Sequence, residues 1–291
     1  MNPLVLYLAS GESLYLGAAL LLLLVLLSFY SISRVAMSLQ RRLIWVALAL
    51  MIMGSPPFLW LLDIVFAAVF LLWFISNRKR DWEISRPLRI TSACALIIVL
   101  IGLTFGELYH RRLSVVRATS SDHVVVLGDS ISAGLGGRVR PWPELMQEIS
   151  GMQVKNLSKA GATLKDGAAM AKQVVPQDRL VLIELGGNDL IAGEPYGSFA
   201  RSLESVLQRL AEQGRTVIMF ELPLLPEMIP YGQAQRRLSK KYGVVLIPKR
   251  FLAGVLSGGD ATSDGLHLTE VGARRMALLV SRVLTLGVKS S

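Results

Sequence analysis

Residues 124–130, with the sequence Val-Val-Val-Leu-Gly-Asp-Ser, decide the fold class of the C-terminal half. Four apolar residues in a row before a glycine indicate a strand that is buried on both faces. Similar apolar runs follow it, at residues 154–157, 180–185, 216–220 and 244–247. Stretches with helical periodicity alternate with these runs, at residues 142–150, 165–174, 197–213, 232–242 and 270–286. This alternation predicts a parallel sheet covered by helices on both faces.

Polar motifs stand where reactive groups gather on such a sheet, at the carboxyl ends of its strands. Ser130 follows the first strand directly, and Gly-Gly-Asn-Asp at 186–189 follows the strand at 180–185. Near the C-terminus, Asp264 and His267 precede a helix that Thr269 could cap. Taken singly, a Gly-Asp-Ser turn or an Asp-x-x-His loop is more often structural than catalytic.

A serine hydroxyl becomes a strong nucleophile only when a base takes its proton, and that base needs a third group to orient it. The chain has three histidines. His110 lies in the segment between the two halves of the chain and His123 begins a strand, so we interpret both as structural. His267 has Asp264 three residues before it, a spacing that lets the carboxylate fold back onto the imidazole.

Four motifs in chain order give residues 122–287 a resemblance to the SGNH (GDSL) hydrolases. They are Gly-Asp-Ser at 128–130, Asn-Leu-Ser-Lys-Ala-Gly at 156–161, Gly-Gly-Asn-Asp at 186–189 and Asp-Gly-Leu-His at 264–267. The strings Val-Leu-Gly-Asp-Ser, Trp-Pro-Glu-Leu and Glu-Leu-Gly-Gly-Asn-Asp are most similar to the bacterial multifunctional acyl thioesterase/lysophospholipase/arylesterase branch.

The resemblance implies a three-layer α/β/α domain with a flavodoxin-like parallel sheet, and it implies a role for each matching residue. Ser130 would be the nucleophile, His267 the base and Asp264 the group that orients it. The N–H groups of Ser130 and Gly161 and the amide of Asn188 would form the oxyanion hole, where three neutral donors can meet a developing negative charge. No metal ion and no cofactor are expected.

Two positions separate this chain from neighbouring patterns. The Gly-x-Ser-x-Gly elbow of ordinary α/β-hydrolases would need glycine where Ser132 stands. Leu268 occupies the position after the histidine where the SGNH family often has proline. We expect the second difference to affect the loop and not the triad.

The N-terminal part has a different composition. The whole chain is 52% hydrophobic with a mean hydropathy of +0.49, and most of this excess lies before residue 108. Four apolar segments predict transmembrane helices, at roughly 13–33, 43–54, 58–76 and 90–107. The second segment is short, so it either begins earlier, with Arg41 and Arg42 reaching the interface, or is re-entrant. A cleavable signal peptide is disfavoured because no basic residue precedes Arg34.

The distribution of charge favours a membrane over nucleic acid as the reason for the net charge of +10. No basic stripe interleaves with aromatic residues, as a nucleic-acid interface would require. Four crossings would place eight Lys/Arg on one side and only Arg111, Arg112 and Arg117 on the other, whereas three crossings would give six against five. The positive-inside rule therefore favours four helices with both termini outside.

We therefore predict a transmembrane region at 1–107, a linker at 108–121 and an SGNH hydrolase domain at 122–291. The expected protein is a multi-pass inner-membrane esterase with its hydrolase domain on the periplasmic side. Its expected substrate is an acyl ester or thioester, and a lipid is one candidate for it. Two alternatives stay open. One is an O-acetyl esterase or O-acyltransferase acting on envelope polysaccharide, and the other is a non-catalytic scaffold in an envelope-assembly complex. A protein partner could bind through the transmembrane region.

Overall fold

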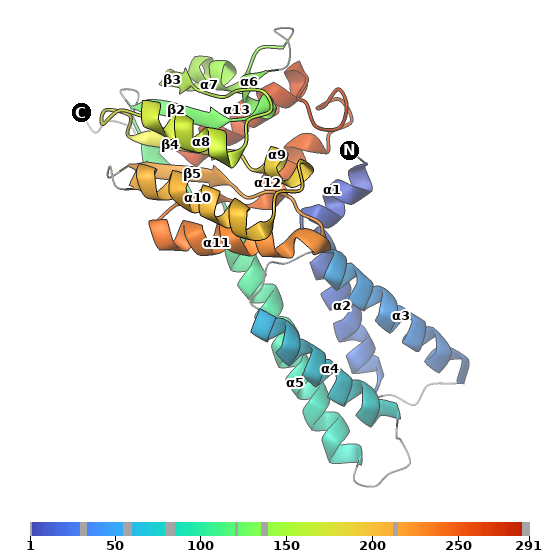
Figure 1. Ribbon diagram of the computed structural model, residues 1–291. Coiled ribbons are helices and arrows are strands. Elements are labelled where there is room, and N and C mark those ends of the chain that lie inside the picture. The colour runs from blue at the N-terminus through green and yellow to red at the C-terminus, as the bar shows by residue number, and fades with distance from the viewer. Residues whose placement is uncertain are drawn as a thin grey trace, which may run out of the picture. The chain divides into compact units, whose positions relative to one another are not determined.

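The structure is a computed structural model (Figure 1) and describes residues 2–29, 34–54, 60–78, 85–119, 122–134, 139–211 and 215–286. It divides the chain into two units. The sheet unit combines Met1–Ser10 with Leu113–Ser291, and the helical unit is Gly11–Arg112. In sequence, the helical unit is therefore an insertion between the first helix and the remainder of the sheet unit.

Five parallel strands form the central sheet of the sheet unit. In spatial order they are β3 (Gln153–Asn156), β2 (His123–Gly128), β4 (Leu180–Glu184), β5 (Thr216–Phe220) and β6 (Val245–Ile247). Numbered along the chain within this sheet, the order is 2-1-3-4-5, which is the flavodoxin-like order. All five strands lie at the apolar runs seen in the sequence, so the predicted parallel sheet is confirmed.

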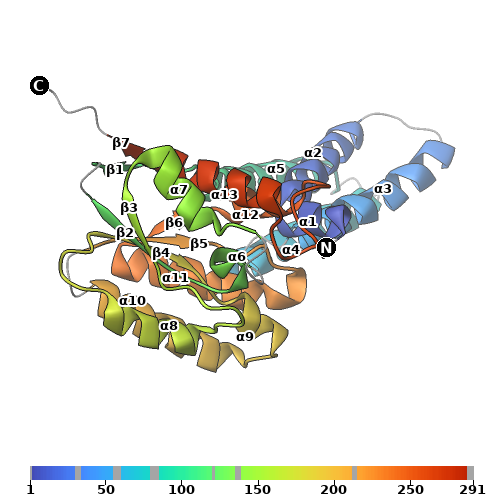
Figure 2. The same cartoon turned by 90° about the horizontal axis from the view of Figure 1, so that it is seen from above.

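Alternate side chains of the central strands enter two separate cores, because successive residues of a strand point to opposite faces. Val124 and Val126 belong to one core, and Val125 and Leu127 to the other. Figure 2 shows a helical layer on each face of the sheet. One layer consists of α7 (Trp142–Ser150), α12 (Lys249–Leu256) and α13 (Glu270–Val283); the other consists of α8 (Leu164–Met170), α10 (Tyr196–Ala211) and α11 (Ile229–Tyr242). The three-layer α/β/α architecture is thus also confirmed.

Helix α1 (Pro3–Ala9) is part of the sheet unit. The Asn2 side chain caps it by accepting the N–H of Leu4 at 2.8 Å, and Pro3 occupies its first turn. Leu6 is 1% exposed and lies in the same core as the α12 and α13 side chains. The sequence predicts residues 1–107 as one helical region, but the structure assigns the first ten residues to the sheet unit, because Leu6 is buried in its core.

A second small sheet involves the segment expected to be a linker. Strand β1 (Val116–Ala118) pairs in parallel with β7 (Leu284–Leu286) at the end of α13. Val116 and Ala118 are buried while Arg117 between them is exposed. The linker residues 113–118 are therefore built into the sheet unit.

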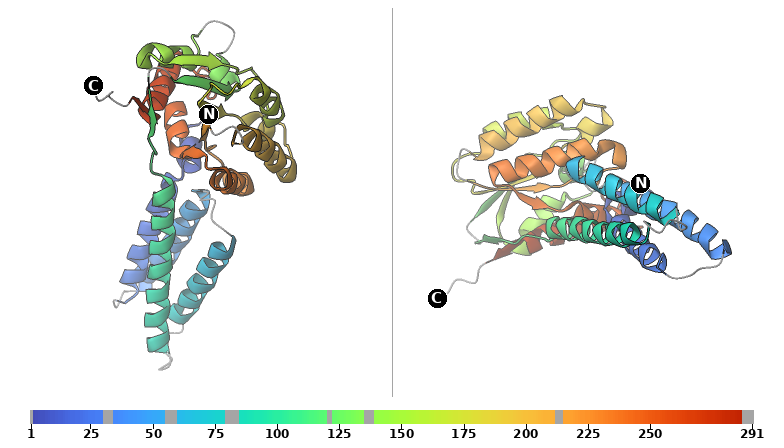
Figure 3. Two further views of the ribbon diagram at one scale, coloured as in Figure 1. Left: turned by 90° about the vertical axis from the view of Figure 1, so that its left-hand side faces the viewer. Right: turned by 90° about the horizontal axis from the view of Figure 1, so that it is seen from below.

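Four helices make up the helical unit: α2 (Glu12–Leu27), α3 (Arg34–Met53), α4 (Trp60–Arg78) and α5 (Ser85–His110). Figure 3 shows them in blue to teal, with α2 beside α3 and α4 beside α5. Gly17 lets α2 approach α3 closely, since a Cβ there would meet the Ala47 carbonyl oxygen at 2.6 Å. The segment expected at 43–54 is a helix that begins at Arg34, and at 20 residues it reaches ~30 Å.

Among the described residues, one helix, Arg86–His110, is long and apolar enough to cross a membrane. A second would count if α1 and α2, which are interrupted at Ser10–Gly11, formed one broken span, and the apolar stretch Leu61–Asn77 is shorter. Many large apolar side chains of this unit point outward, including Ile98 and Phe105, each 68% exposed. The four predicted crossings stay a prediction.

Candidate active site

Ser130 is placed by the end of β2 and the start of the short helix α6 (Ser130–Ala133). Asp129 caps this helix, because its Oδ1 accepts the N–H of Ile131 at 2.9 Å. A larger residue does not fit at Gly128, at the end of the strand, because a Cβ there would meet the Ser132 side chain at 2.5 Å and the Ser158 Oγ at 2.8 Å. The chain therefore turns tightly and leaves Ser130 half-buried at the carboxyl edge of the sheet.

Asn188 comes to this edge from the next strand, as the sequence predicts. It lies in α9 (Gly187–Ile191), directly after β4, and its Nδ2 donates to Asp129 Oδ2 at 3.2 Å and to the Ala162 carbonyl at 3.0 Å. The loop after β3 is held at the end of β2, because the Lys159 N–H donates to the Gly128 carbonyl at 3.1 Å. Gly161 in that loop has a φ of +75°, a conformation that favours glycine.

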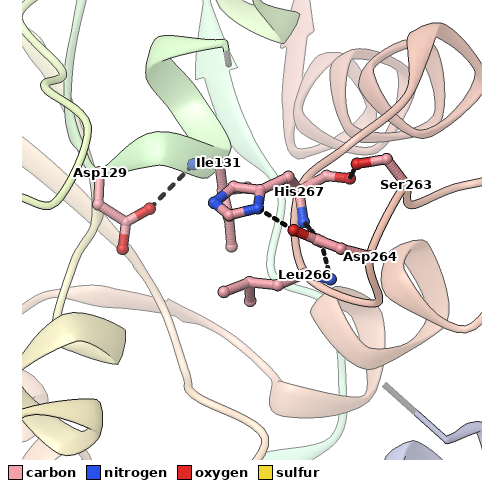
Figure 4. Close-up of polar contacts among 6 residues, drawn as sticks. All are labelled: Asp129, Ile131, Ser263, Asp264, Leu266 and His267. Carbon is pink, nitrogen blue, oxygen red and sulfur yellow. Dashed lines mark hydrogen bonds and ion pairs between the residues drawn. The ribbon is translucent and has the colours of Figure 1, made fainter. Parts of the chain in front are cut away.

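Asp264 and His267 form a hydrogen-bonded pair in the loop before α13 (Figure 4). Asp264 Oδ2 lies 2.5 Å from His267 Nδ1, and its Oδ1 accepts the N–H groups of His267 at 2.8 Å and Leu266 at 3.0 Å. These hydrogen bonds hold the pKa of the Asp264 carboxyl well below its ordinary value. An ionised carboxylate at Nδ1 fixes the tautomer that keeps Nε2 free to accept a proton.

The remaining ring nitrogen of His267 points away from Asp264. Figure 4 places it on the side of Asp129 and Ile131, the chain neighbours of Ser130. Between the described residues Ser130 and His267 themselves there is no hydrogen bond. Catalytic hydrogen bonds are often long in the absence of substrate and shorten when it binds.

The backbone hydrogen bonds of the loop around His267 do not use the N–H of residue 268. The isolated antiparallel bridge of this loop uses the N–H of Ser263, donated to the His267 carbonyl at 2.9 Å, and the N–H of Thr269, donated to the Ala261 carbonyl at 2.9 Å. Leu268 donates to neither bond, and its side chain is buried. Thr269 caps α13, as predicted, by accepting the N–H of Gly272 at 3.3 Å.

A cavity of about 380 Å³ brings Ser130, Asn188 and Asp264 together. Asp129, Glu184 and Gly187 also line it. Aliphatic side chains provide most of the remaining lining: Val5, Ala9, Ile131, Leu190, Ile191, Leu222, Leu224, Leu225, Met228, Leu252, Leu256 and Leu266. Gly161 and His267 are not among the lining residues. A mainly apolar cavity with a few convergent polar groups is the usual form of a small-molecule site.

Behind Ser130 lies a buried polar network that sequence analysis did not assign to the site. Glu184, 2% exposed, accepts the Ser132 hydroxyl at 2.8 Å, and Ser132 in turn accepts the indole N–H of Trp142 at 3.0 Å. Burial raises the pKa of the Glu184 carboxyl well above its ordinary value, with a smaller contribution from the Asp129 charge, and burial also raises the pKa of Asp129. The sequence feature that could have pointed to this network is Glu184 itself, an acidic residue at the end of an otherwise apolar strand.

The chain combines a three-layer α/β/α domain with a serine at the end of a central strand, and comparison with known proteins identifies its family. Residues 126–275 match the GDSL-like Lipase/Acylhydrolase family, and the chain belongs to it. The chain is 32% identical over 160 residues to Esterase TesA of Pseudomonas aeruginosa, covering 50% of this chain and 78% of that protein.

Two further relatives are also named as esterases or thioesterases. An arylesterase of Vibrio mimicus is 30% identical over 165 residues, covering 51% of this chain and 80% of that protein. Thioesterase 1/protease 1/lysophospholipase L1 of Escherichia coli K12 is 29% identical over 164 residues, covering 52% and 77%. The protein is therefore an SGNH/GDSL serine hydrolase that acts on ester bonds, and the predicted resemblance is confirmed.

Proposed function

We propose that the protein is a membrane-anchored serine esterase that cleaves acyl esters or thioesters through an acyl-enzyme on Ser130. The observation that carries the proposal is the cavity, in which Ser130, Asn188 and Asp264 meet an otherwise mainly aliphatic lining. Such a lining suits an acyl chain better than a polysaccharide, whose hydroxyl groups would lose hydrogen bonds to water there.

The reaction has two steps in this proposal. Ser130 Oγ attacks the substrate carbonyl while His267 Nε2 takes its proton, and Asp264 stabilises the resulting imidazolium through Nδ1. The tetrahedral oxyanion collapses to the acyl-enzyme as His267 gives the proton to the leaving alcohol or thiol. Water, deprotonated by His267, then attacks the acyl group and releases the acid and free Ser130.

The oxyanion meets donors from three elements in the transition state. Ser130 begins α6, where the first N–H groups have no partner within the helix. Gly161 offers its N–H from the loop after β3. Both hydrogens of the Asn188 amide have acceptors in the free enzyme, Asp129 and the Ala162 carbonyl, and one of them turns to the oxyanion.

Membrane anchoring belongs to the same proposal. It is supported by α5, which is long and apolar enough to cross a bilayer, by the outward-facing apolar side chains of the helical unit, and by the excess of Lys/Arg in loops assigned to one side. We place the protein in the inner membrane with the sheet unit on the periplasmic side.

Ser130→Ala tests the nucleophile. We expect a fluorophosphonate, which reacts with activated serines, to label the full-length protein and not the variant, and we expect hydrolysis of p-nitrophenyl butyrate to fall to background. The matched control is Ser257→Ala, at an exposed serine at the end of α12, which should keep both signals. Labelling that persists in Ser130→Ala would contradict the assignment.

A further inference from the structure

Helix α1 contributes two side chains to the cavity that contains Ser130. Val5 and Ala9 are among the lining residues, with Val5 half-buried and Ala9 2% exposed. They are four positions apart in the chain, so both lie on one face of the helix. Neither residue lies within the range 126–275 that matches the family, and both precede the helical insertion. This wall of the cavity is therefore an addition to the part of the chain that the family covers.

The position of α1 is fixed by packing within the sheet unit. Leu6, 1% exposed, anchors it in the core, and the helix contacts α12. Helix α12 contributes Leu252 and Leu256 to the same cavity, again four residues apart. At the other end of α1, the Ser10 hydroxyl donates to the Tyr7 carbonyl at 2.7 Å. Two packed helices thus offer one aliphatic pair each to a single space.

We propose that α1 is a specificity element of this esterase, and that Val5 and Ala9 contact the acyl chain of the substrate and limit its length. The proposal rests on the proposed function, because it assigns the aliphatic part of the cavity to the acyl group bound to Ser130. The polar lining residues supply the ester-binding end, and an extended hydrocarbon is the ligand chemistry that matches the remainder. Adding or removing a methylene in such a pocket changes discrimination roughly 10- to 200-fold.

The test uses the full-length protein in detergent with the p-nitrophenyl esters of acetic, butyric, octanoic and dodecanoic acids. The quantity measured is the ratio of kcat/KM for each longer ester to kcat/KM for the acetate. Ala9→Leu fills space beside the acyl chain, so the octanoyl and dodecanoyl ratios should fall by roughly tenfold or more. Val5→Ala opens space and should raise the dodecanoyl ratio by several-fold. Leu4→Ala is the matched control, because Leu4 is 62% exposed and outside the cavity lining, and it should leave every ratio unchanged.

Two results would overturn the proposal. Ratios that stay constant in Ala9→Leu and Val5→Ala, or a parallel loss on all four esters, would mean that α1 only supports the fold. If Ala9→Leu does not fold, as shown by loss of fluorophosphonate labelling, Val5→Ala carries the test alone. Failure of the proposed function looks different, since the unaltered protein would then hydrolyse no ester and take no label.

Discussion

At the scale of one residue, Glu184 shows how burial at the end of a strand changes the pKa of a carboxyl group. Its carboxyl is buried behind α6 and accepts the Ser132 hydroxyl. Because burial raises its pKa, the folded protein holds this proton at pH values where the unfolded chain releases it. The contribution of Glu184 to stability is therefore greatest below its ordinary pKa and decreases as the pH rises from that value towards the folded pKa.

Glu184→Gln tests this reasoning, because glutamine keeps an oxygen acceptor for Ser132 and does not titrate. We expect Glu184 to make the free energy of unfolding fall as the pH rises above 4.5, its ordinary pKa, with a slope of up to about 1.4 kcal/mol per pH unit until the folded pKa is reached. Urea denaturation in detergent should show a shallower slope in Glu184→Gln. The control is Glu227→Gln at an exposed position. Equal slopes in all three proteins would mean that Glu184 is ionised in the fold.

At the scale of elements, α13 packs closely against the loop that carries Asp264 and His267. A Cβ at Gly272 would meet the Ala261 carbonyl oxygen at 2.0 Å, and that oxygen already accepts the N–H of Thr269. The glycine therefore sets how closely the loop that carries Asp264 and His267 lies against the start of α13.

Gly272→Ala should push that loop out of position. We expect it to lower kcat by roughly tenfold or more, since a shift of about 1 Å at a catalytic group can cost 10²-fold, and to destabilise the fold by about 1–3 kcal/mol. Gly254→Ala is the matched control, in the interior of α12 with no atom within 4 Å of the added Cβ, and it should stabilise by about 0.5–1 kcal/mol. The measurements are ester kinetics and urea denaturation. Equal kinetics in the two variants would show that the contact relaxes without moving His267.

The elements that sequence predicts well are those with long apolar or periodic patterns. The five central strands and the helices α7, α10 and α13 fall into this group. Burial of a strand on both faces requires a run of apolar residues, and burial of one helical face requires apolar residues at helical spacing. The short elements α6, α9 and β1 have no such pattern. Helix α6 depends on capping by Asp129, α9 on its position after β4, and β1 on pairing with β7.

The site divides in the same way. Ser130 and Asn188 were predictable because they follow strands, and Asp264 and His267 because they complete the ordered motifs of the family that the chain resembles. The structure brings Ser130, Asn188 and Asp264 to one cavity. Their catalytic roles stay predictions. The contribution of α1 could not be predicted, since seven residues carry too little periodicity and the contact depends on tertiary packing.

At the scale of the whole molecule, the topology can be tested by cysteine labelling. In a Cys94→Ser background, we expect a single cysteine at Ser114 to react with an impermeant maleimide in intact cells, and one at Asp81 to react only after the membrane is permeabilised. The physical reason is the excess of Lys/Arg around residues 78–89, which favours the cytoplasmic side. The reverse pattern would place the hydrolase in the cytoplasm.

Because residues 1–10 belong to the sheet unit, the chain leaves that unit at Ser10 and returns to it at Leu113. A folded unit cannot lie on both sides of a bilayer, so both links must be on the same side. If the insertion between them crosses a membrane, it must therefore do so an even number of times, such as two or four. Three crossings, which the count of Lys/Arg on the two sides only disfavours, would place α1 and the rest of the sheet unit on opposite sides of the bilayer. Leu6 could then not be buried in the core where the structure has it.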